Sequence, residues 1–454
     1  MGRWPVEFTG TWLQAFIFPG GLKMANSPYQ IGLIGCGTVG TGVLELLHRR
    51  RDVFTGILGR SIEVSKVVVR DLEKTRHNVY GFVKPDVFTG DPADVTGNPE
   101  IELVVEVAGG VDMPLQWMTE ALSNGKDVVT ANKAALALHG DEIFELAAAN
   151  KRAVYYEASV AAAIPIIEIL QNGLVANQIT HLSGILNGTC NYILTRMEEA
   201  GLGYGEALEE AQQKGFAEAD PTLDVNGDDS AHKLALLARI ITHSHIPVEK
   251  IFTEGIAEIT SEDIVFASGL GYRIKLLSIG SRHEDGSWDL RVHPCLVHRD
   301  EVLAQVRKEV NAVQVKGDAI GPMLVYGSGA GSFPTASSVV ADIVRAAKGD
   351  RPAMNSANGQ SPEIVSIDRV AVRNYIRVTV LDLPGVLGRV TSFFGMKGIN
   401  IQSMQQPEAK HGQPVPVVLV THAVEDEVVS RALDELRERT DLLNGPTTRI
   451  RIED

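Results

Sequence analysis

Along the first third of the chain, short apolar runs alternate with stretches in which apolar residues recur at helical spacing. Five runs predict buried strands, at residues 30–34, 62–69, 101–107, 127–130 and 153–156. Val43, Leu44 and Leu47 mark the first helix, and further helices are predicted over residues 114–123 and 140–150. Because strands and helices alternate, the sequence predicts an α/β domain built on a doubly wound parallel sheet.

The rest of the chain follows a different pattern. Residues 166–320 combine longer helices with mixed strand candidates, and a helix is predicted at 335–347. Residues 348–366 are polar and rich in Pro, Gly, Ser and Asn, which is typical of a linker. Beyond them, the order strand–helix–strand–strand–helix–strand predicts a ferredoxin-like unit, with strands near 375–380, 398–401, 415–421 and 449–452 and helices near 386–394 and 425–440.

Length and charge limit the class of protein. The 454 residues correspond to about three domains. A net charge of −15 argues against nucleic acid or an anionic membrane as the main partner, and no apolar run is long enough to span a membrane. Cys36, Cys190 and Cys295 are too scattered for a disulfide framework, so a cytoplasmic location is expected. Residues 1–27 fit no predicted element; we expect a disordered extension, with Met24 as a candidate start.

A glycine-rich turn, Gly35-x-Gly37-x-x-Gly40, separates the first predicted strand from the first predicted helix. In that context, the glycines permit a tight turn and the close approach of a pyrophosphate, which the helix N-terminus then stabilises. The turn therefore predicts a dinucleotide site. A tight strand–helix turn without a ligand fits the same residues.

The end of the second predicted strand bears on the choice of cofactor. An acidic residue there binds the ribose 2′-hydroxyl of NAD, whereas a nearby arginine accommodates the 2′-phosphate of NADP. The chain has Arg70 followed by Asp71, with Lys74 and Arg76 close behind. The cations favour NADP, and Asp71 keeps NAD open. A solvated charged loop explains the same residues without a cofactor.

Carboxylates are concentrated just before a predicted helix. They are Glu218, Asp220, Asp224, Asp228 and Asp229. Apolar spacing predicts a helix that starts near Asp228, which places Asp229 and Lys233 four residues apart on one face. An exposed ion pair explains this pattern. The alternative is an active site in which Lys233 exchanges a proton with a substrate oxygen while carboxylates hold a substrate ammonium.

Five separated segments share their motifs with one family, and together they extend over nearly the whole chain from about residue 29. They are Ile31–Gly40, Thr130–Lys133, Leu186–Leu194, the spaced set Glu218-x-Asp220-Pro221-x-x-Asp224-x-x-Gly227-x-Asp229-x-x-x-Lys233, and Gly329–Ser337. In these segments the chain resembles bacterial homoserine dehydrogenase, in the form that ends in an ACT domain. The resemblance implies an α/β Rossmann domain at 28–157 completed by the helix at 331–350, an α+β catalytic and dimerisation domain at 158–330, a linker at 351–367 and a ferredoxin-like ACT domain at 368–454.

The resemblance also implies an activity and its residues. The family interconverts L-aspartate 4-semialdehyde and L-homoserine with NAD or NADP, on the pathway to threonine and methionine. Lys233 is then the proton donor and acceptor, and Lys133 is a second active-site lysine. The implied substrate-binding residues are Glu218, Asp224, Asp229, Gly188 and Thr189. The implied cofactor-binding residues are Gly35, Gly37, Thr38, Val39, Gly40, Arg70, Ala108, Gly109, Lys133 and Gly329.

Two further ligands follow from the same resemblance. A Na⁺ site between the domains maps onto the carboxylate of Glu157 and the carbonyls of Val160, Ala162 and Ile164. In the C-terminal unit, Asp382, Gly385 and Asn400 are candidates for binding threonine as an effector. A purely structural dimerisation module is the alternative for that unit, and a homodimer or homotetramer is expected.

Two rival functions make different demands on the sequence. A non-catalytic amino-acid sensor with an ACT domain predicts broken acid–lysine positions, but Lys133, Glu218, Asp229 and Lys233 are all present. A semialdehyde enzyme that works through a cysteine thiolate needs an activated cysteine with a nearby base. Cys36 lies in the glycine turn and Cys190 has no histidine near it in sequence, so this second rival is disfavoured.

Overall fold

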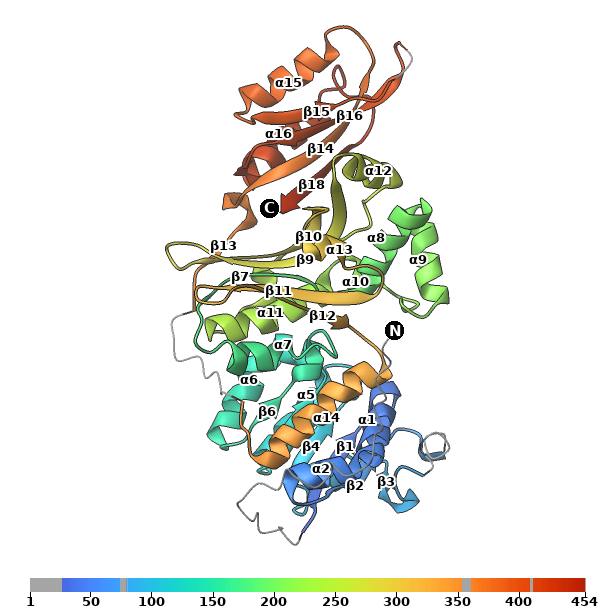
Figure 1. The fold of residues 1–454 in the computed structure, drawn as a ribbon, viewed down its shortest axis with the longest axis vertical. Coiled ribbons are helices and arrows are strands. Elements are labelled where there is room, and N and C mark those ends of the chain that lie inside the picture. The colour runs from blue at the N-terminus through green and yellow to red at the C-terminus, as the bar shows by residue number, and fades with distance from the viewer. Residues whose placement is uncertain (1–26, 74–78, 80, 353–360, 409–410, 454) are drawn as a thin grey trace, which may run out of the picture.

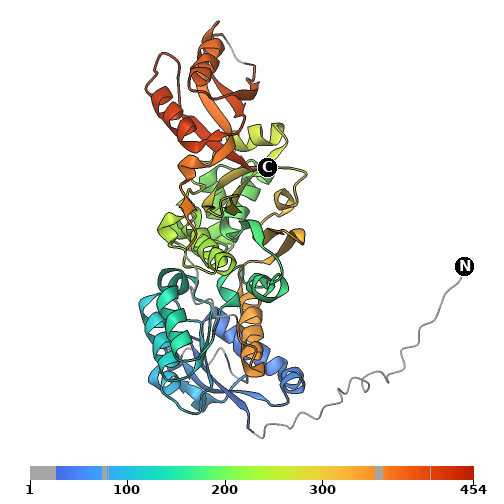
Figure 2. The ribbon, with the colours of Figure 1, turned by 90° about the vertical axis from the view of Figure 1, so that its left-hand side faces the viewer.

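The structure, a computed structural model, describes residues 27–73, 79, 81–352, 361–408 and 411–453. The expected N-terminal extension, Lys74, Arg76 and the middle of the predicted linker lie outside these residues, apart from Ser27. The described chain is elongated, with the N-terminal domain at one end, a large sheet in the middle and the C-terminal unit at the other end (Figures 1 and 2).

The N-terminal domain is built on a parallel sheet. In the described residues its strand order is β3-β2-β1-β4-β5-β6. The strands are β1 Tyr29–Ile34, β2 Ile62–Val68, β3 Phe88–Thr89, β4 Leu103–Glu106, β5 Asp127–Thr130 and β6 Val154–Tyr155. The helices are α1 Thr38–Arg49, α2 Arg51–Leu58, α4 Ala93–Thr96, α5 Asp112–Ser123 and α6 Lys133–Ala149. The strand order reverses between β1 and β4, which is where a dinucleotide binds in this fold. The predicted doubly wound sheet is confirmed.

Helix α14 (Ser332–Lys348) returns to the N-terminal domain after the chain has formed the middle sheet. It packs along α1 and contributes Ala336, Val339 and Ile343 to the core beneath β1. Gly42 permits this close packing, because a Cβ there would lie 2.9 Å from Ser332 Oγ. In Figures 1 and 2 the orange α14 accordingly lies among the blue elements.

Helix α6 begins earlier than the sequence pattern predicts. The predicted start at Gly140 is wrong, since the helix runs from Lys133 to Ala149 with a kink at His139. The Asn132 side chain caps it by accepting a hydrogen bond from Ala135 N, and the Ala-Leu-rich first turns favour a helix. The consequence is functional, because Lys133 becomes the first residue of the helix.

The middle domain packs its longer helices against an antiparallel sheet in the order β12-β11-β7-β9-β10. The strands are β7 Ile179–Ile185, β9 Tyr272–Arg282, β10 Trp288–His298, β11 Val310–Gly317 and β12 Gly321–Ser328, with the short β8 Phe252–Thr253 beside β10. The helices are α7 Ile166–Glu168, α8 Gly188–Ala200, α9 Tyr204–Gln213, α10 Thr222–Val225, α11 Asp228–Thr242, α12 Ser261–Gly269 and α13 Val302–Gln305.

The C-terminal unit has the predicted strand–helix–strand–strand–helix–strand order. Its main elements are β14 Ala371–Leu381, α15 Val386–Met396, β15 Ile401–Gln405, β16 Pro414–Thr421, α16 Asp426–Arg437 and β18 Thr447–Glu453, with the short β13 Ile364–Val365 and β17 Val424–Glu425. The sheet order is β18-β14-β16-β15. Apolar residues of α15 and α16 form one core with β14 and β16.

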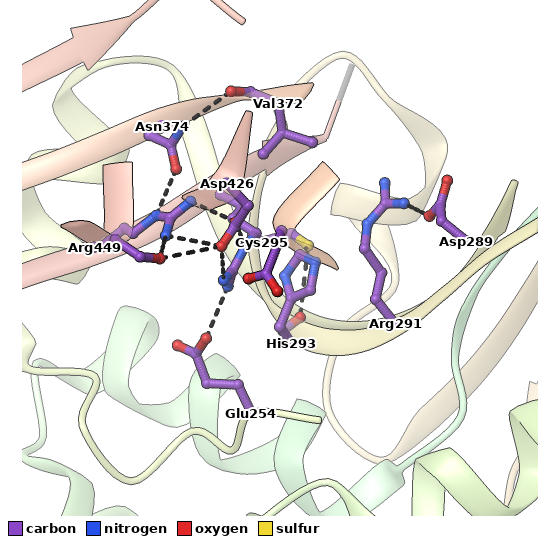
Figure 3. Close-up of polar contacts among 12 residues, drawn as sticks. Glu254, Asp289, Arg291, His293, Cys295, Val372, Asn374, Asp426 and Arg449 are labelled. Carbon is purple, nitrogen blue, oxygen red and sulfur yellow. Dashed lines mark hydrogen bonds and ion pairs between the residues drawn. The ribbon is translucent and has the colours of Figure 1, made fainter. Parts of the chain in front are cut away.

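The C-terminal unit is joined to the middle domain by backbone hydrogen bonds, which the predicted linker did not suggest. β18 pairs in parallel with β10, with Cys295 opposite Arg451. Charged side chains accompany the junction: the buried Arg451 donates to the buried Asp426 Oδ1 over 2.7 Å and to the more exposed Glu254 Oε2 over 2.8 Å. Figure 3 shows Asp426, Arg449 and Glu254 at this junction. One continuous sheet therefore runs through both units.

Candidate active site

In the glycine turn, the structure requires glycine at Gly35 and at Gly40. Gly35 has a φ of +98°, and a Cβ there would lie 2.8 Å from the backbone of Ala108. A Cβ at Gly40 would lie 2.2 Å from the carbonyl oxygen of Gly35. At Gly37 a Cβ would meet nothing within 4 Å, so this position faces open space. No side chain caps α1, whose first amides, at Thr38 and Val39, are the donors that a pyrophosphate needs.

The other cofactor candidates lie at the same edge of the sheet. Arg70 and Asp71 follow β2 and are exposed, and Ala108 and Gly109 follow β4. Gly329 lies between β12 and α14, and a Cβ there would lie 2.1 Å from Asn311 Cγ. Glycine is therefore required at 329 by close packing. The residues at this edge fit a bound dinucleotide.

One carboxylate joins the two lysines of the site. Lys233 Nζ donates to Asp229 Oδ2 over 2.7 Å and to the carbonyl oxygen of Leu186 over 2.6 Å. Lys133 Nζ, from the N-terminal domain, lies 3.1 Å from Asp229 Oδ1. The side chains of Asp229 and Lys233 are only 8% and 11% exposed, whereas that of Lys133 is 41% exposed. The exposed ion pair considered from the sequence is therefore wrong, and the pair lies inside a domain junction.

The start of helix α8 holds this cluster in place. Asn187, its N-cap, donates to Asp224 Oδ1 over 2.7 Å and to Asp229 Oδ2 over 2.9 Å. Thr189 donates to the carbonyl oxygen of Phe216 and lies 3.2 Å from Asp224 Oδ2. A Cβ at Gly188 would lie 2.7 Å from the carbonyl oxygen of Glu309, so only glycine fits there.

Charge interactions favour the ionised forms of Asp229 and Lys133. Burial by itself would raise the pKa of Asp229, but Lys233 and Lys133 hold it well below its ordinary value. Asp229 in turn raises the pKa of Lys133 against the opposing effect of burial, with smaller contributions from Asp224 and Glu218. Glu218 is exposed and acts on Lys133 through its charge. The predicted substrate carboxylates and both lysines therefore belong to one electrostatic unit.

Comparisons with known proteins agree with this geometry. The family model for homoserine dehydrogenase matches residues 165–344, that for its NAD-binding domain matches residues 35–157, and that for the ACT domain matches residues 374–441. The homoserine dehydrogenase of Pseudomonas aeruginosa is 43% identical over 94% of this chain and 99% of its own length. The chain belongs to the homoserine dehydrogenase family.

Solved structures of the family share the fold. A homoserine dehydrogenase from Thiobacillus denitrificans is 41% identical with a TM-score of 0.86, over 94% of this chain and 99% of that chain. A hyperthermophilic archaeal homoserine dehydrogenase in complex with NADPH is 25% identical with a TM-score of 0.60, over 70% of this chain and 98% of that chain. The chain is thus an oxidoreductase that uses a nicotinamide dinucleotide, with a Rossmann domain, a catalytic domain and an ACT domain.

Membership of an enzyme family argues against the non-catalytic amino-acid sensor. The second rival, an enzyme that works through a cysteine thiolate, is disfavoured by the state of the cysteines. Burial raises the pKa of the Cys190 and Cys295 thiols well above the ordinary value, and raises that of Cys36. None of these three thiols is therefore poised as a thiolate nucleophile. In the described ranges, no group of three or more His, Cys, Asp and Glu could hold a metal ion, and no helix is long and apolar enough to cross a membrane.

The segment expected to bind Na⁺ has an unusual backbone. Ala161 and Ala162 both have positive φ values, of 54° and 42°, which non-glycine residues rarely adopt. Both oxygens of the Glu157 carboxylate accept amide hydrogen bonds, from Ile167 and Glu168. The carboxylate therefore caps the helical turn that begins at Ile166.

The effector candidates of the ACT domain do not all lie together. Asp382 and Gly385 line a shallow pocket at the end of β14, where Gln406 Nε2 donates to Asp382 Oδ1. Asn400 precedes β15, and its carbonyl oxygen accepts from His422 N, just beyond the far end of β16. Within one chain, Asp382 and Asn400 are therefore separated by the length of β16.

Sequence reasoning missed two asparagines of the site. Asn187 bridges Asp224 and Asp229, and the Asn311 side chain donates to the same Leu186 carbonyl oxygen that Lys233 contacts. Asn187 had a local signal, since it stands immediately before Gly188 and Thr189 at a predicted helix start. Asn311 had none, because it comes from a strand distant in sequence.

Proposed function

We propose that this protein catalyses the NAD(P)-dependent interconversion of L-aspartate 4-semialdehyde and L-homoserine, with Lys233 as the proton donor and acceptor. The observation that carries the proposal is the placement of Asp229 between Lys133 and Lys233. This contact joins the dinucleotide-binding domain to the domain that carries the remaining substrate-binding candidates. Such a junction is where a cofactor and a small substrate meet.

The chemistry of Lys233 follows from its hydrogen bonds. A lysine ammonium has three N–H donors. Two are used on Leu186 and Asp229, which leaves one for a substrate oxygen. The nicotinamide supplies the hydride when the cofactor is bound. Lys233 then donates its proton as negative charge develops on the aldehyde oxygen, and it accepts a proton in the reverse direction.

The remaining polar groups bind and orient the substrate. Asp224 and Glu218 carry negative charge toward the site and suit the ammonium of an amino-acid substrate. Thr189 adds a hydroxyl beside Asp224. Lys133, which is more exposed than Lys233, stabilises the developing oxyanion from the cofactor side.

We propose that the protein prefers NADP to NAD. Arg70 is exposed at the end of β2, where a 2′-phosphate would lie. A direct assay tests both the activity and the preference. Purified protein given L-homoserine should reduce NADP⁺ and, less efficiently, NAD⁺. Amino-acid binding without any cofactor reduction would instead support the sensor hypothesis.

The proposed threonine site is formed by the ACT domains of two chains. Asp382 and Asn400 lie at opposite ends of their sheet, and β15 is an exposed edge strand. Antiparallel pairing of two β15 strands across a two-fold axis would bring Asn400 of one copy toward Asp382 of the other. Threonine would then bind between two ACT domains of a homodimer or homotetramer and inhibit an early step of threonine and methionine synthesis.

The proposal also includes a Na⁺ site and a cytoplasmic location. The strained backbone at Ala161 and Ala162 supports a Na⁺ site built from the Glu157 carboxylate and the carbonyl oxygens of Val160, Ala162 and Ile164. The carbonyl oxygen of Ala162 also accepts from Ser338 Oγ. A cytoplasmic location, expected from the cysteine content, remains a prediction.

A further inference from the structure

Glu106, at the carboxyl end of β4, is a buried carboxylate to which the proposed mechanism gives no role. Its side chain is fully buried, and among the described residues it has no cationic partner. Its Oε1 accepts the N–H of Ala108 over 2.8 Å, and its Oε2 accepts the hydroxyl of Thr130 over 2.7 Å. Burying an ionised carboxylate without a cationic partner costs free energy, which indicates that Glu106 has a role that offsets this cost.

These two contacts belong to a ring of hydrogen bonds that the backbone between Ala108 and Gly110 closes. Thr130 Oγ1, which donates to Glu106, accepts the N–H of Asn132 over 2.9 Å. The Asn132 side chain donates to the carbonyl oxygen of Gly110 over 2.8 Å and accepts from Ala135 N at the start of α6. The ring therefore links the turn after β4 to the turn after β5.

Both turns carry residues with proposed roles. The first contains Ala108 and Gly109, which are cofactor candidates, and the second leads directly into Lys133. We propose that Glu106 is a positioning residue that fixes these two turns relative to each other, and so sets the place of Lys133 beside the cofactor. The inference rests on the proposed role of Lys133.

The ring needs the two acceptors of an ionised carboxylate. Glutamine has one acceptor and one donor end, so it would present an N–H group to either Ala108 or Thr130. Thr130 cannot compensate by reversing its hydroxyl, because it would then leave a buried donor without an acceptor. Burial raises the pKa of Glu106 to about 7, which is the cost of keeping two acceptors in this place.

A double-mutant cycle on the full-length protein tests the proposal. Glu106→Gln and Thr130→Val should each lower kcat by about 10- to 100-fold and raise the KM for NADP⁺, because small displacements of reacting groups have effects of this size. Thr130→Ser, which keeps the hydroxyl, should stay near wild type. If both residues act through one ring, the double variant should lose no more than the worse single variant.

A control separates positioning from stability. Lys126 lies just before β5 at the opposite edge of the sheet and donates to the carbonyl oxygens of Asn98 and Ile101. Lys126→Met should lower the melting temperature and leave kcat and KM unchanged. Three results would overturn the proposal. One is wild-type kinetics in a folded Glu106→Gln, and another is that the losses of the two single variants multiply in the double variant. The third is that Lys126→Met loses as much activity as Glu106→Gln. Should Glu106→Gln not fold, the contrast between Thr130→Val and Thr130→Ser decides. An inactive wild type would refute the proposed function instead.

Discussion

Asp229 Oδ1 lies 3.1 Å from Lys133 Nζ, and Asp229 Oδ2 lies 2.7 Å from Lys233 Nζ. The Asp229 carboxylate thus offsets the positive charges of two lysines that come from different domains. Since Asp229 and Lys233 are almost fully enclosed, solvent screens the interaction weakly. These contacts hold the Lys233 ammonium in a fixed direction and link the two domains through Lys133.

Replacing Asp229 by asparagine keeps its shape and removes its charge. The buried Lys233 and the more exposed Lys133 would then repel each other without a compensating anion, which should lower the pKa of Lys133 and disorder Lys233. We expect kcat/KM for homoserine to fall by roughly 100-fold or more. The control is Asp228→Asn, in the same helical turn, which should retain activity within a factor of about three. Equal losses in both variants would contradict the specific role of Asp229.

The carboxyls of Glu157 and Asp342 predict how stability varies with pH. Burial is the main cause that raises the pKa of each to about 7, and Asp342 adds to the shift of Glu157. In the unfolded chain both ionise near pH 4. As pH rises from about 4 to about 7, the unfolded state loses protons that the folded state retains, so stability falls and then levels off.

Asp342→Asn removes one of these two titrations. The fall in melting temperature between about pH 5 and about pH 8 should therefore be smaller than in wild type by roughly 2–5 °C. Glu284→Gln, in an exposed loop, serves as the control and should follow wild type. An unchanged pH dependence in Asp342→Asn would show that the buried pair does not titrate in this range.

The ACT domain has a physical connection to the active site through Glu254. Arg451, on β18, donates to Glu254 Oε2 over 2.8 Å. Two residues further on, Ile256 N donates to the carbonyl oxygen of Val225, directly after Asp224. A Cβ at Gly255 would lie 2.2 Å from the same carbonyl oxygen, so the two segments are in tight contact. A movement of β18 would be transmitted to the acid–lysine cluster.

Glu254→Gln should therefore uncouple regulation from catalysis. Because the glutamine weakens the charged link to Arg451, inhibition by threonine should require an about tenfold higher concentration, while kcat without threonine stays near wild type. The exposed Glu258→Gln is the matched control. Unaltered inhibition in Glu254→Gln would exclude this connection as the route.

The proposed two-chain effector site predicts complementation. Asp382→Ala and Asn400→Ala should each abolish threonine inhibition when assayed alone. When the two variants are unfolded and refolded together, mixed dimers should regain one intact site, formed by Asn400 of the first and Asp382 of the second. Partial recovery of inhibition in the mixture is the expected result. Complete absence of recovery, with mixed dimers demonstrated by mass, would contradict a shared site.

Local patterns predicted most of the fold. The glycine turn, the alternating strands and the C-terminal ferredoxin-like order depend on neighbouring residues, and the structure confirms them. The sequence pattern predicted only residues 140–150 as a helix, whereas α6 begins at Lys133 and packs Ala135 and Leu136 into the core. The pairing of β10 with β18 had no sequence signal, since each strand is compatible with many partners.

The site was only partly predictable for the same reason. The spacing of Asp229 and Lys233 predicted their place on one helical face but not their burial. That burial depends on the turn between β7 and α8, where Leu186 O accepts from Lys233 and Asn187 donates to Asp229. The approach of Lys133 to Asp229 crosses between domains and depends on the whole fold. Asn311 joins from a distant strand, so no local pattern could have identified it.

The most direct test of the central claim is the single-turnover rate of hydride transfer in Lys233→Ala, measured with homoserine and NADP⁺ against wild type. NADPH binding, followed by its fluorescence, and the melting temperature establish that the variant is folded and binds cofactor. The account predicts that wild type reduces NADP⁺ only when homoserine is present, and that the rate in Lys233→Ala falls by about 1,000-fold or more. A wild-type rate in Lys233→Ala, or no homoserine-dependent reduction by wild type, would contradict it.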